Sequence, residues 1–209
     1  MRGPSIWARL IGRKPDAPAD GRALLTAVVT ARLNVRSIPE DRSFYYGDPL
    51  DAVLAERSLG EVTDGGTMFD TGTGRIEYTD LEIGLQDASA ETLAVITDTL
   101  ESLGAPVGSY LDVHAERRKI HFGRYEGLAL AVARAAFRDP DDPAGEVNAL
   151  LTALEAGLGD AGAFRGYWEG EDDCELYFYG PAYEPMRAKI AAMAAARPEL
   201  THCRVSQIA

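Results

Sequence analysis

Hydrophobic and polar residues alternate in several short segments of the chain, and this alternation predicts β-strands. Residues 24–35 have the two-residue period of a half-buried strand. Residues 60–69 and 74–85 are also strand-like, and the Gly-rich stretch DTGTG between them predicts a hairpin. Within the second of these strands the apolar residues change from even to odd positions near Thr79 and Asp80, so we expect a β-bulge there.

Two segments of the first half have helical signals instead. In the first, Asp48 is expected to cap the helix, Pro49 to occupy its first position and Gly60 to follow its end. In the second, residues 88–103 place their large apolar side chains on one side of a helix, and Gly104 ends it. The segment VGSYLDV then predicts a strand that completes the first half.

The second half shows the same order of elements. GLALAVARAAF predicts a strand, and Asp142 and Pro143 are expected to begin a helix. AFRGYWEG and CELYFYG predict a second hairpin. Residues 185–197 predict another helix, and LTHCRVSQI predicts the last strand.

This order predicts an α+β protein built from tandem duplicated ferredoxin-like (βαββαβ) units. Each unit is expected to form a four-stranded antiparallel sheet with helices on one face. We assign residues 1–21 to a flexible or amphipathic N-terminal segment, 22–118 to the first unit and 119–209 to the second. Sequence identity between the halves is low, so the duplication is inferred from the order and spacing of the elements.

The strand CELYFYG raises a question, because it carries aromatic residues on both faces. Tyr177 and Tyr179, with Tyr167 or Trp168 from the neighbouring strand, are expected on the face that no helix covers. A bare aromatic face usually marks a contact surface. Two arrangements are open: the sheets face each other or another subunit, or the units lie side by side and leave an open sheet for a partner.

The net charge indicates which partners are not expected, and the cysteine content indicates the cellular compartment. The formal net charge of -12 repels phosphates, so nucleic acid is not expected as a partner. Glu175 also stands where an RNA-binding strand of this topology carries a basic residue. The third and fourth strands of such a unit lie about 9.6 Å apart. A disulfide between Cys174 and Cys203 is therefore not expected, and the thiols indicate a cytoplasmic protein.

The N-terminal segment differs from the rest of the chain. Its apolar residues recur at helical spacing among arginines and a lysine. A helix docked on the protein's own surface or a frayed tail is the preferred interpretation, and membrane contact through residues 5–14 is the alternative. The sequence contains no apolar run of about 20 residues, the length that spans a bilayer.

Candidate chemistry is sparse. The stretch MFDTGTG resembles the aspartic protease signature, but such enzymes need two copies and a tight turn explains a single one. The predicted hairpin carries a cluster of carboxylates. A solvated acidic edge is the preferred interpretation, and a surface for a basic partner, then a metal site, are the alternatives. The three histidines lack zinc-type spacing. We therefore expect no catalytic residue, no metal and no cofactor.

Six pieces of sequence, in order, resemble a family of uncharacterised bacterial cytoplasmic proteins with two such units. The resemblance covers roughly residues 30 to 209 and is carried by YGDPLDAVL, LGEVTDGGTM, GRIEYTDLEIGL, LGAPVGSYL, GRYEGLALAV and YWEGEDDCELYFYG. It implies the fold but no reaction. Among the positions it shares, the polar and aromatic residues that a core does not require are candidate site residues.

These observations lead to two hypotheses of function. The first is a non-enzymatic, immunity-like or regulatory binding protein, whose acidic hairpin and aromatic sheet face engage a protein partner, expected to be basic. The second is a small-ligand site, or an enzyme without a known motif, in a cleft between the sheets. The candidate binding residues are Arg32, Glu61, Glu77, Tyr78, Asp80, Tyr167, Trp168, Tyr177 and Tyr179.

Overall fold

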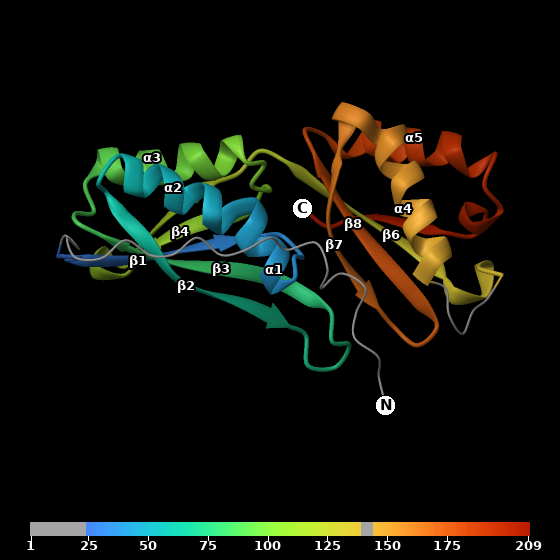
Figure 1. The fold of residues 1–209 in the computed structure, drawn as a ribbon, viewed down its shortest axis with the longest axis horizontal. Helices are drawn as coiled ribbons and strands as arrows, with labels where there is room; N and C mark the ends of the chain where they lie inside the picture. The colour runs from blue at the N-terminus through green and yellow to red at the C-terminus, as the bar shows by residue number, and fades with distance from the viewer. Residues whose placement is uncertain (1–23, 139–143) are drawn as a thin grey trace.

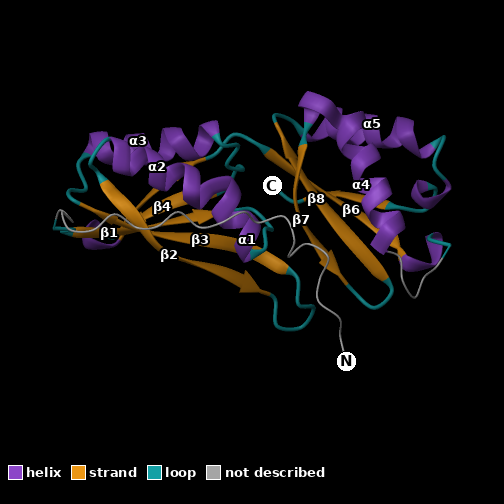
Figure 2. Ribbon diagram, viewed as in Figure 1, coloured by secondary structure: helices purple, strands orange, loops and turns teal. Residues whose placement is uncertain are grey.

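Two antiparallel sheets lie beside each other, and each has helices on one face only. The structure, a computed structural model, describes residues 24–138 and 144–209. Helices α2 and α3 cover the first sheet, and α4 and α5 cover the second (Figures 1 and 2). The N-terminal segment 1–21 and the expected helix cap at Asp142 and Pro143 lie outside the described residues.

The first unit contains a five-stranded sheet with the order β2-β3-β1-β4-β5. Its elements are β1 (Ala27–Leu33), α1 (Pro39–Arg42), the π-helix η2 (Ser43–Gly47), α2 (Asp48–Glu56), β2 (Gly60–Phe69), β3 (Ile76–Leu85), α3 (Ala90–Ser102), β4 (Ser109–Val113), the short 3-10 helix η3 (His114–Glu116) and β5 (Arg118–Phe122).

The second unit contains a four-stranded sheet with the order β7-β8-β6-β9. Its elements are β6 (Glu126–Ala133), η4 (Arg134–Ala136), α4 (Ala144–Leu158), η5 (Gly159–Ala161), β7 (Ala163–Glu169), β8 (Asp173–Gly180), α5 (Tyr183–Ala194), η6 (Pro198–Leu200) and β9 (Arg204–Gln207). Apart from β5, the two sheets have the same strand order, which is the ferredoxin-like arrangement. The predicted α+β fold is confirmed.

The fifth strand of the first sheet was not expected. β5 pairs antiparallel with β4, from Ser109 opposite Phe122 to Val113 opposite Arg118. The boundary that the sequence analysis placed between residues 118 and 119 therefore falls inside a strand of the first sheet. The chain turns from β4 into β5 through η3 and Arg117, whose φ of 51° is left-handed.

The first helical segment begins earlier than expected. The chain is helical from Pro39, and it passes through the π-helix Ser43–Gly47 before α2. The residue before Asp48, Gly47, already has helical angles, and no side chain caps α2. Asp48 is therefore the first residue of α2 and not its N-cap, so the predicted capping role was wrong.

The predicted bulge in β3 exists, but at another residue. Met68 lies opposite Tyr78 and Phe69 opposite Ile76, so Glu77 is the extra residue, not Thr79 or Asp80. From Thr79 to Leu85 the pairing with β1 is continuous. Thr79 is buried with the odd-numbered residues, and Tyr78 lies on the other face. A second bulge interrupts β2 between Val62 and Asp64.

The alternating side chains of β8 belong to two different cores. Leu176 and Phe178 pack with β6 under α4 and α5. Tyr177 and Tyr179 point the other way and join the core of the first unit, together with Ala129 of β6. These rings do lie in an interface, and the covering surface is the first unit of the same chain. The two sheets do not face each other, because no described segment covers the bare face of the first sheet.

Two smaller expectations concern the cysteines and the membrane. Cys174 and Cys203 are both free thiols, as the strand order predicted. Within residues 24–138 and 144–209, the helices are all too short or too polar to cross a membrane.

Candidate functional site

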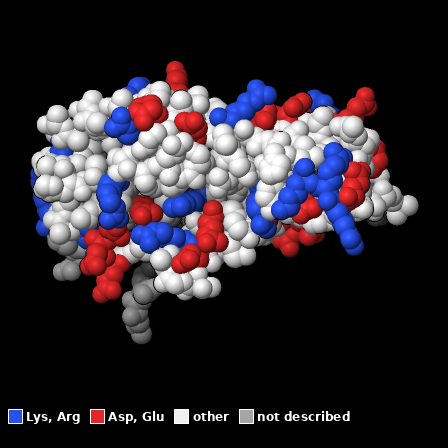
Figure 3. All heavy atoms as spheres, turned by 180° about the vertical axis from the view of Figure 1, so that it is seen from behind, with Lys and Arg blue, Asp and Glu red and all other residues white. Residues whose placement is uncertain are grey.

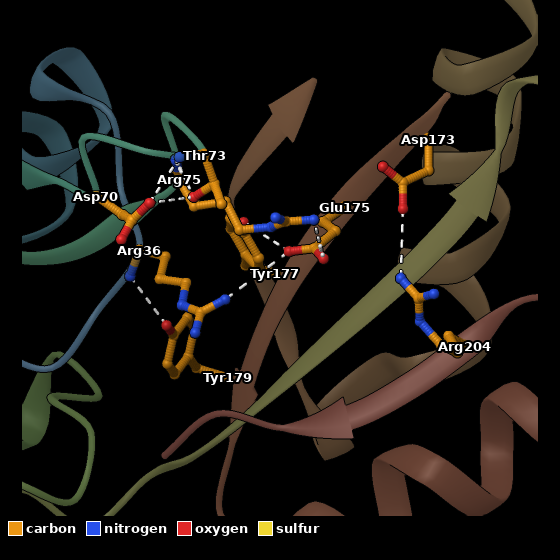
Figure 4. A network of polar contacts seen from close by, with 9 residues as sticks. All are labelled: Arg36, Asp70, Thr73, Arg75, Asp173, Glu175, Tyr177, Tyr179 and Arg204. Atoms are coloured by element: carbon orange, nitrogen blue, oxygen red, sulfur yellow. Dashed lines mark hydrogen bonds and ion pairs between the residues drawn. The ribbon is translucent and has the colours of Figure 1, made fainter. Parts of the chain in front are cut away.

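The contact between the two units, here called the seam, is formed where the chain leaves β1 and reaches the uncovered face of the second sheet. The backbone N–H of Arg36 donates a hydrogen bond of 2.9 Å to the hydroxyl oxygen of Tyr179 (Figure 4). Gly166 of β7 approaches the same loop so closely that a Cβ atom there would lie 2.3 Å from the Arg36 carbonyl oxygen. Only glycine fits this position.

A carboxylate lies at the centre of the seam (Figure 4). Glu175 accepts a hydrogen bond of 3.1 Å from Nη2 of Arg75 and one of 3.0 Å from the Tyr177 hydroxyl. Nη1 of Arg36 is 3.8 Å from Oε2 of Glu175, the oxygen that also accepts the Tyr177 hydroxyl. Because the Glu175 side chain is only 11% exposed, its charge needs these partners. Two arginines of the first unit thus hold one carboxylate of the second.

Cation–π contacts join the units in both directions. The guanidinium of Arg75, in the first unit, lies 3.9 Å from the ring centre of Trp168 in β7. The guanidinium of Arg165, also in β7, lies 4.3 Å from the ring centre of Tyr45 in the first unit. Such contacts each stabilise by roughly 0.5–2 kcal/mol, depending on exposure. They fix the orientation of the two units.

The predicted site residues of the second unit are therefore mostly structural. Tyr177 and Tyr179 are 0% and 1% exposed, so neither ring can stack on an external ligand. Burial, and then the charge of Glu175, raise the pKa of Tyr177, and burial raises the pKa of Tyr179. Both hydroxyls remain protonated and act as hydrogen-bonding groups. Trp168 and Tyr167 are half-buried on the same strand, Trp168 under Arg75.

The uncovered face of the first sheet differs, because no described segment lies over it. Cross-strand pairing places its side chains in two rows. The first row contains Asp80, Arg32, Tyr110 and His121. The second row contains Asp64, Glu82, Thr30, Asp112 and Lys119. We call these nine residues, with Tyr78, the open face.

Arg32 is the centre of the first row. Its Nε and Nη2 atoms each donate a hydrogen bond of 2.9 Å to one oxygen of Asp80, and this contact raises the pKa of Arg32. The guanidinium also lies 3.7 Å from the ring centre of Tyr78 and 5.6 Å from that of Tyr110. Nζ of Lys119 lies 4.1 Å from the centre of the Tyr110 ring. The alternating cations and rings hold one another in fixed positions.

The predicted acidic hairpin is dispersed along β2 and β3. Glu77, at the bulge, is exposed, whereas Glu61 lies opposite Gly84 at the far end of the hairpin. Asp80 is paired with Arg32 on the open face. In the described part of the chain, no group of three or more His, Cys, Asp and Glu residues could hold a metal ion.

The Asp-Thr-Gly stretch forms a turn, as predicted. Oδ1 of Asp70 accepts hydrogen bonds from the backbone N–H groups of Gly72 and Thr73, at 3.1 and 2.6 Å, and from the Thr73 hydroxyl. These bonds lower the pKa of Asp70. The carboxylate therefore stabilises the turn between β2 and β3.

Of the predicted residues, the structure brings Arg32, Tyr78 and Asp80 together on the open face. It places Trp168, Tyr177 and Tyr179 at the seam, whereas Tyr167 packs on the core of the second unit. Sequence reasoning missed two groups that complete these sites: Arg36, Arg75 and Glu175 at the seam, and Tyr110, Asp112, Lys119 and His121 on the open face. Glu175 within a strand of apolar residues was a signal, since such a charge needs a partner.

Charge on the surface is mixed in sign. Figure 3 shows the molecule from behind, where Lys and Arg side chains lie among Asp and Glu side chains over both units. No field of a single sign covers the face in this view. Local pairing, such as that of Arg32 with Asp80, explains why the net charge of -12 is not visible as one continuous patch.

Comparison with known proteins gives a few distant likenesses, and no family model matches the sequence. Ribosomal RNA small subunit methyltransferase G of Synechococcus sp. (strain CC9311) is 24% identical over 204 residues, which cover 90% of this chain and 76% of that protein. The first two RRM domains of yeast poly(U)-binding protein have 9% identity and a TM-score of 0.25, covering 87% of this chain and 99% of theirs. The regulatory subunit of aspartate kinase from Thermus thermophilus has 14% identity and a TM-score of 0.25, covering 81% of this chain and 93% of its own. The chain is similar to these proteins to this extent only.

Proposed function

We propose that this is a non-enzymatic binding protein that engages a basic protein partner through the open face. One observation supports this most directly. The two sheets have the same order, but the uncovered face of the second packs on the first unit, while that of the first has no covering segment among the described residues. One face is used within the chain, and the other is available to a partner.

The charges of the open face suit a basic partner. Asp64 and Glu82 are both exposed and lie directly opposite each other on β2 and β3. Like charges in this position are destabilising within a sheet. A lysine or arginine of a partner would relieve their repulsion, and Asp112 adds a third carboxylate in the same row.

The same face offers rigid aromatic anchors. Tyr78 and Tyr110 are half-buried, and the cation–π contacts with Arg32 and Lys119 restrict both rings. Tyrosine and arginine are enriched among the residues that contribute most to protein–protein binding. Because these side chains are already ordered, little rotamer freedom is lost when a partner docks.

The experiment compares two charge-reversal variants in a capture assay. In the first, Asp64→Lys and Glu82→Lys change the open face. In the control, Glu91→Lys and Asp98→Lys change exposed positions of α3, on the opposite side of the first sheet. Each variant adds the same charge, so a difference between them reports the face and not the net charge.

A captured protein supports the proposal only if the open-face variant loses it, the α3 variant retains it, and added salt weakens the complex. At 0.1 M salt, charges are screened over about 10 Å, so the attraction between exposed carboxylates and a basic partner should weaken strongly as salt is added. Equal capture by both variants, or no specific capture by the wild-type protein, would contradict the proposed function.

A further inference from the structure

A pocket of about 280 Å³ lies at the edge of the first sheet, between β2 and the helical segment that precedes β2. Its lining includes Arg42 and Ser43 from one end of the segment, Asp48 and Asp51 from α2, and Gly65 from β2. Leu81 of β3 also lines it and belongs to the core under the helices. The pocket therefore lies at the sheet edge on the helix-covered side, and it shares one residue, Asp64, with the open face.

Two irregularities of the backbone meet at this pocket. The π-helix Ser43–Gly47 contributes both its first and its last residue to the lining. The β2 bulge between Val62 and Asp64 borders it as well. Single π-turns and strand bulges weaken regular hydrogen bonding and are frequent beside functional sites.

Gly65 permits a close approach of Arg42. A Cβ atom at this position would lie 2.8 Å from Nε and 2.9 Å from Cζ of Arg42. The guanidinium therefore rests on the bare backbone of β2, where Nη1 donates a hydrogen bond of 3.3 Å to the Thr67 hydroxyl. The cation is held in one position by the strand beneath it.

Arg42 has unused donor capacity. Its Nε atom is buried against Gly65 and has no hydrogen-bond acceptor among the described residues, so the donors that a ligand can reach are those of the terminal nitrogens. None of the ion pairs formed within the described ranges involves Arg42, although three aspartates line the same pocket. Burying a charged group without a paired anion is unfavourable unless another group compensates it.

Two aspartates of α2 also line the pocket. Asp48 and Asp51 are three residues apart on α2, which places them on the same side of the helix. Oδ1 of Asp51 accepts the Val62 N–H at 2.8 Å, which orients this carboxylate toward β2. Asp48 is exposed and makes no hydrogen bond or ion pair within the described residues. The lining therefore combines one guanidinium with the carboxylates of Asp48, Asp51 and Asp64, and no ion pair within the described residues joins them.

We infer that this pocket binds a small zwitterion of the amino-acid class. The carboxylate of the ligand would face the Arg42 guanidinium, and its ammonium group would face Asp48 and Asp51. The volume is slightly below the roughly 300–1,000 Å³ of sites for drug-sized ligands, which suits a molecule of this size. The inference does not depend on the proposed protein partner.

The test measures thermal stability with and without the standard amino acids at about 10 mM, since a ligand that binds only the folded state raises Tm by mass action. For any amino acid that acts, the matched amine and the matched carboxylic acid are measured as well. We expect stabilisation by at least one amino acid and little by either matched compound, because each lacks one of the two charges.

Variants then locate the site. Asp48→Asn removes an exposed carboxylate without breaking a described hydrogen bond, so it should fold normally and weaken binding about tenfold or more, equivalent to about 1.4 kcal/mol. Arg42→Met should act in the same direction. Glu56→Gln, an exposed change on α2 outside the lining, is the control and should bind as the wild type does.

The inference is overturned if no standard amino acid raises Tm, if an amine or acid alone acts equally well, or if Asp48→Asn binds with unchanged affinity. The last result would place the binding elsewhere in the molecule.

Discussion

The hydroxyl oxygen of Tyr179 accepts the backbone N–H of Arg36, which is 143 residues away in the sequence. This bond joins a strand of the second unit to the loop after the first strand of the chain. The Tyr179 ring is 1% exposed, so water cannot replace the hydroxyl when it is removed. The contribution of this bond to stability can therefore be measured with a single substitution.

Tyr179→Phe should lower the free energy of unfolding by about 1–2 kcal/mol, because the Arg36 N–H is left without an acceptor in a part-buried position. Denaturant unfolding measures this change. Tyr183→Phe is the control, because within the described residues the Tyr183 hydroxyl makes no hydrogen bond. If both variants are equally stable, the seam bond contributes nothing.

Glu175→Gln should also destabilise the protein, by about 1–3 kcal/mol, because the hydrogen bond from Arg75 loses its charged acceptor. A double-mutant cycle with Arg75→Met should show coupling between the two residues. Glu184→Gln is the matched control, since it breaks the exposed pair with Arg187 and should leave stability unchanged. Simple additivity of Glu175→Gln and Arg75→Met would show that the contact is not energetically significant.

Asp41 is expected to make the stability of the protein depend on pH. Burial, and then the charge of Glu40, raise the pKa of Asp41 to about 6, although Arg165 opposes the shift. A carboxyl whose pKa is higher in the folded state destabilises folding as pH rises from its unfolded value of 3.8 through 6. Asp41→Asn should therefore raise Tm at neutral pH, and the gain should vanish below about pH 4.

Thermal melts across this pH range check the Asp41 prediction. The gain should rise between the two pKa values and level off above them. A gain that is constant at all pH values would show that the amide acts by packing and that ionisation of Asp41 is not involved.

The two thiols should react at different rates. Burial raises the pKa of Cys174 to about 11, and Cys174 is 8% exposed. Cys203 is more accessible, and its pKa is raised as well. At about pH 8 an aromatic disulfide reagent should label Cys203 first and Cys174 only on unfolding, because the thiolate is the reacting form. Cys203→Ser, which leaves a single thiol, identifies the slow group, and fast labelling of this variant would contradict the burial of Cys174.

The order of strands and helices could be predicted because it follows local periodicity. β5 could not, since residues 118–122 begin with two basic residues and form an edge strand with one buried residue, Phe122. The shift of the β3 bulge from Asp80 to Glu77 has a similar cause. The sequence indicates that the apolar phase changes, but only pairing with β2 determines which residue is extra.

The sequence also predicted the contact role of Tyr177 and Tyr179 correctly, because rings on an uncovered sheet face need a partner. It could not identify that partner. Arg36, Arg75 and Glu175 come from three separate segments, and no local pattern connects them. The roles proposed for the open face and for Arg42 remain predictions that the binding experiments test.

The segment between the two units, residues 123–125, is tied to the first unit along its length. The N–H groups of Arg124 and Tyr125 donate to the Ala105 carbonyl, and the N–H of Val107 donates to the Tyr125 carbonyl. The connection therefore cannot act as a hinge. The first unit therefore has a fixed orientation relative to the second before any partner binds. Association does not have to restrict the relative motion of two tethered units, which would cost free energy.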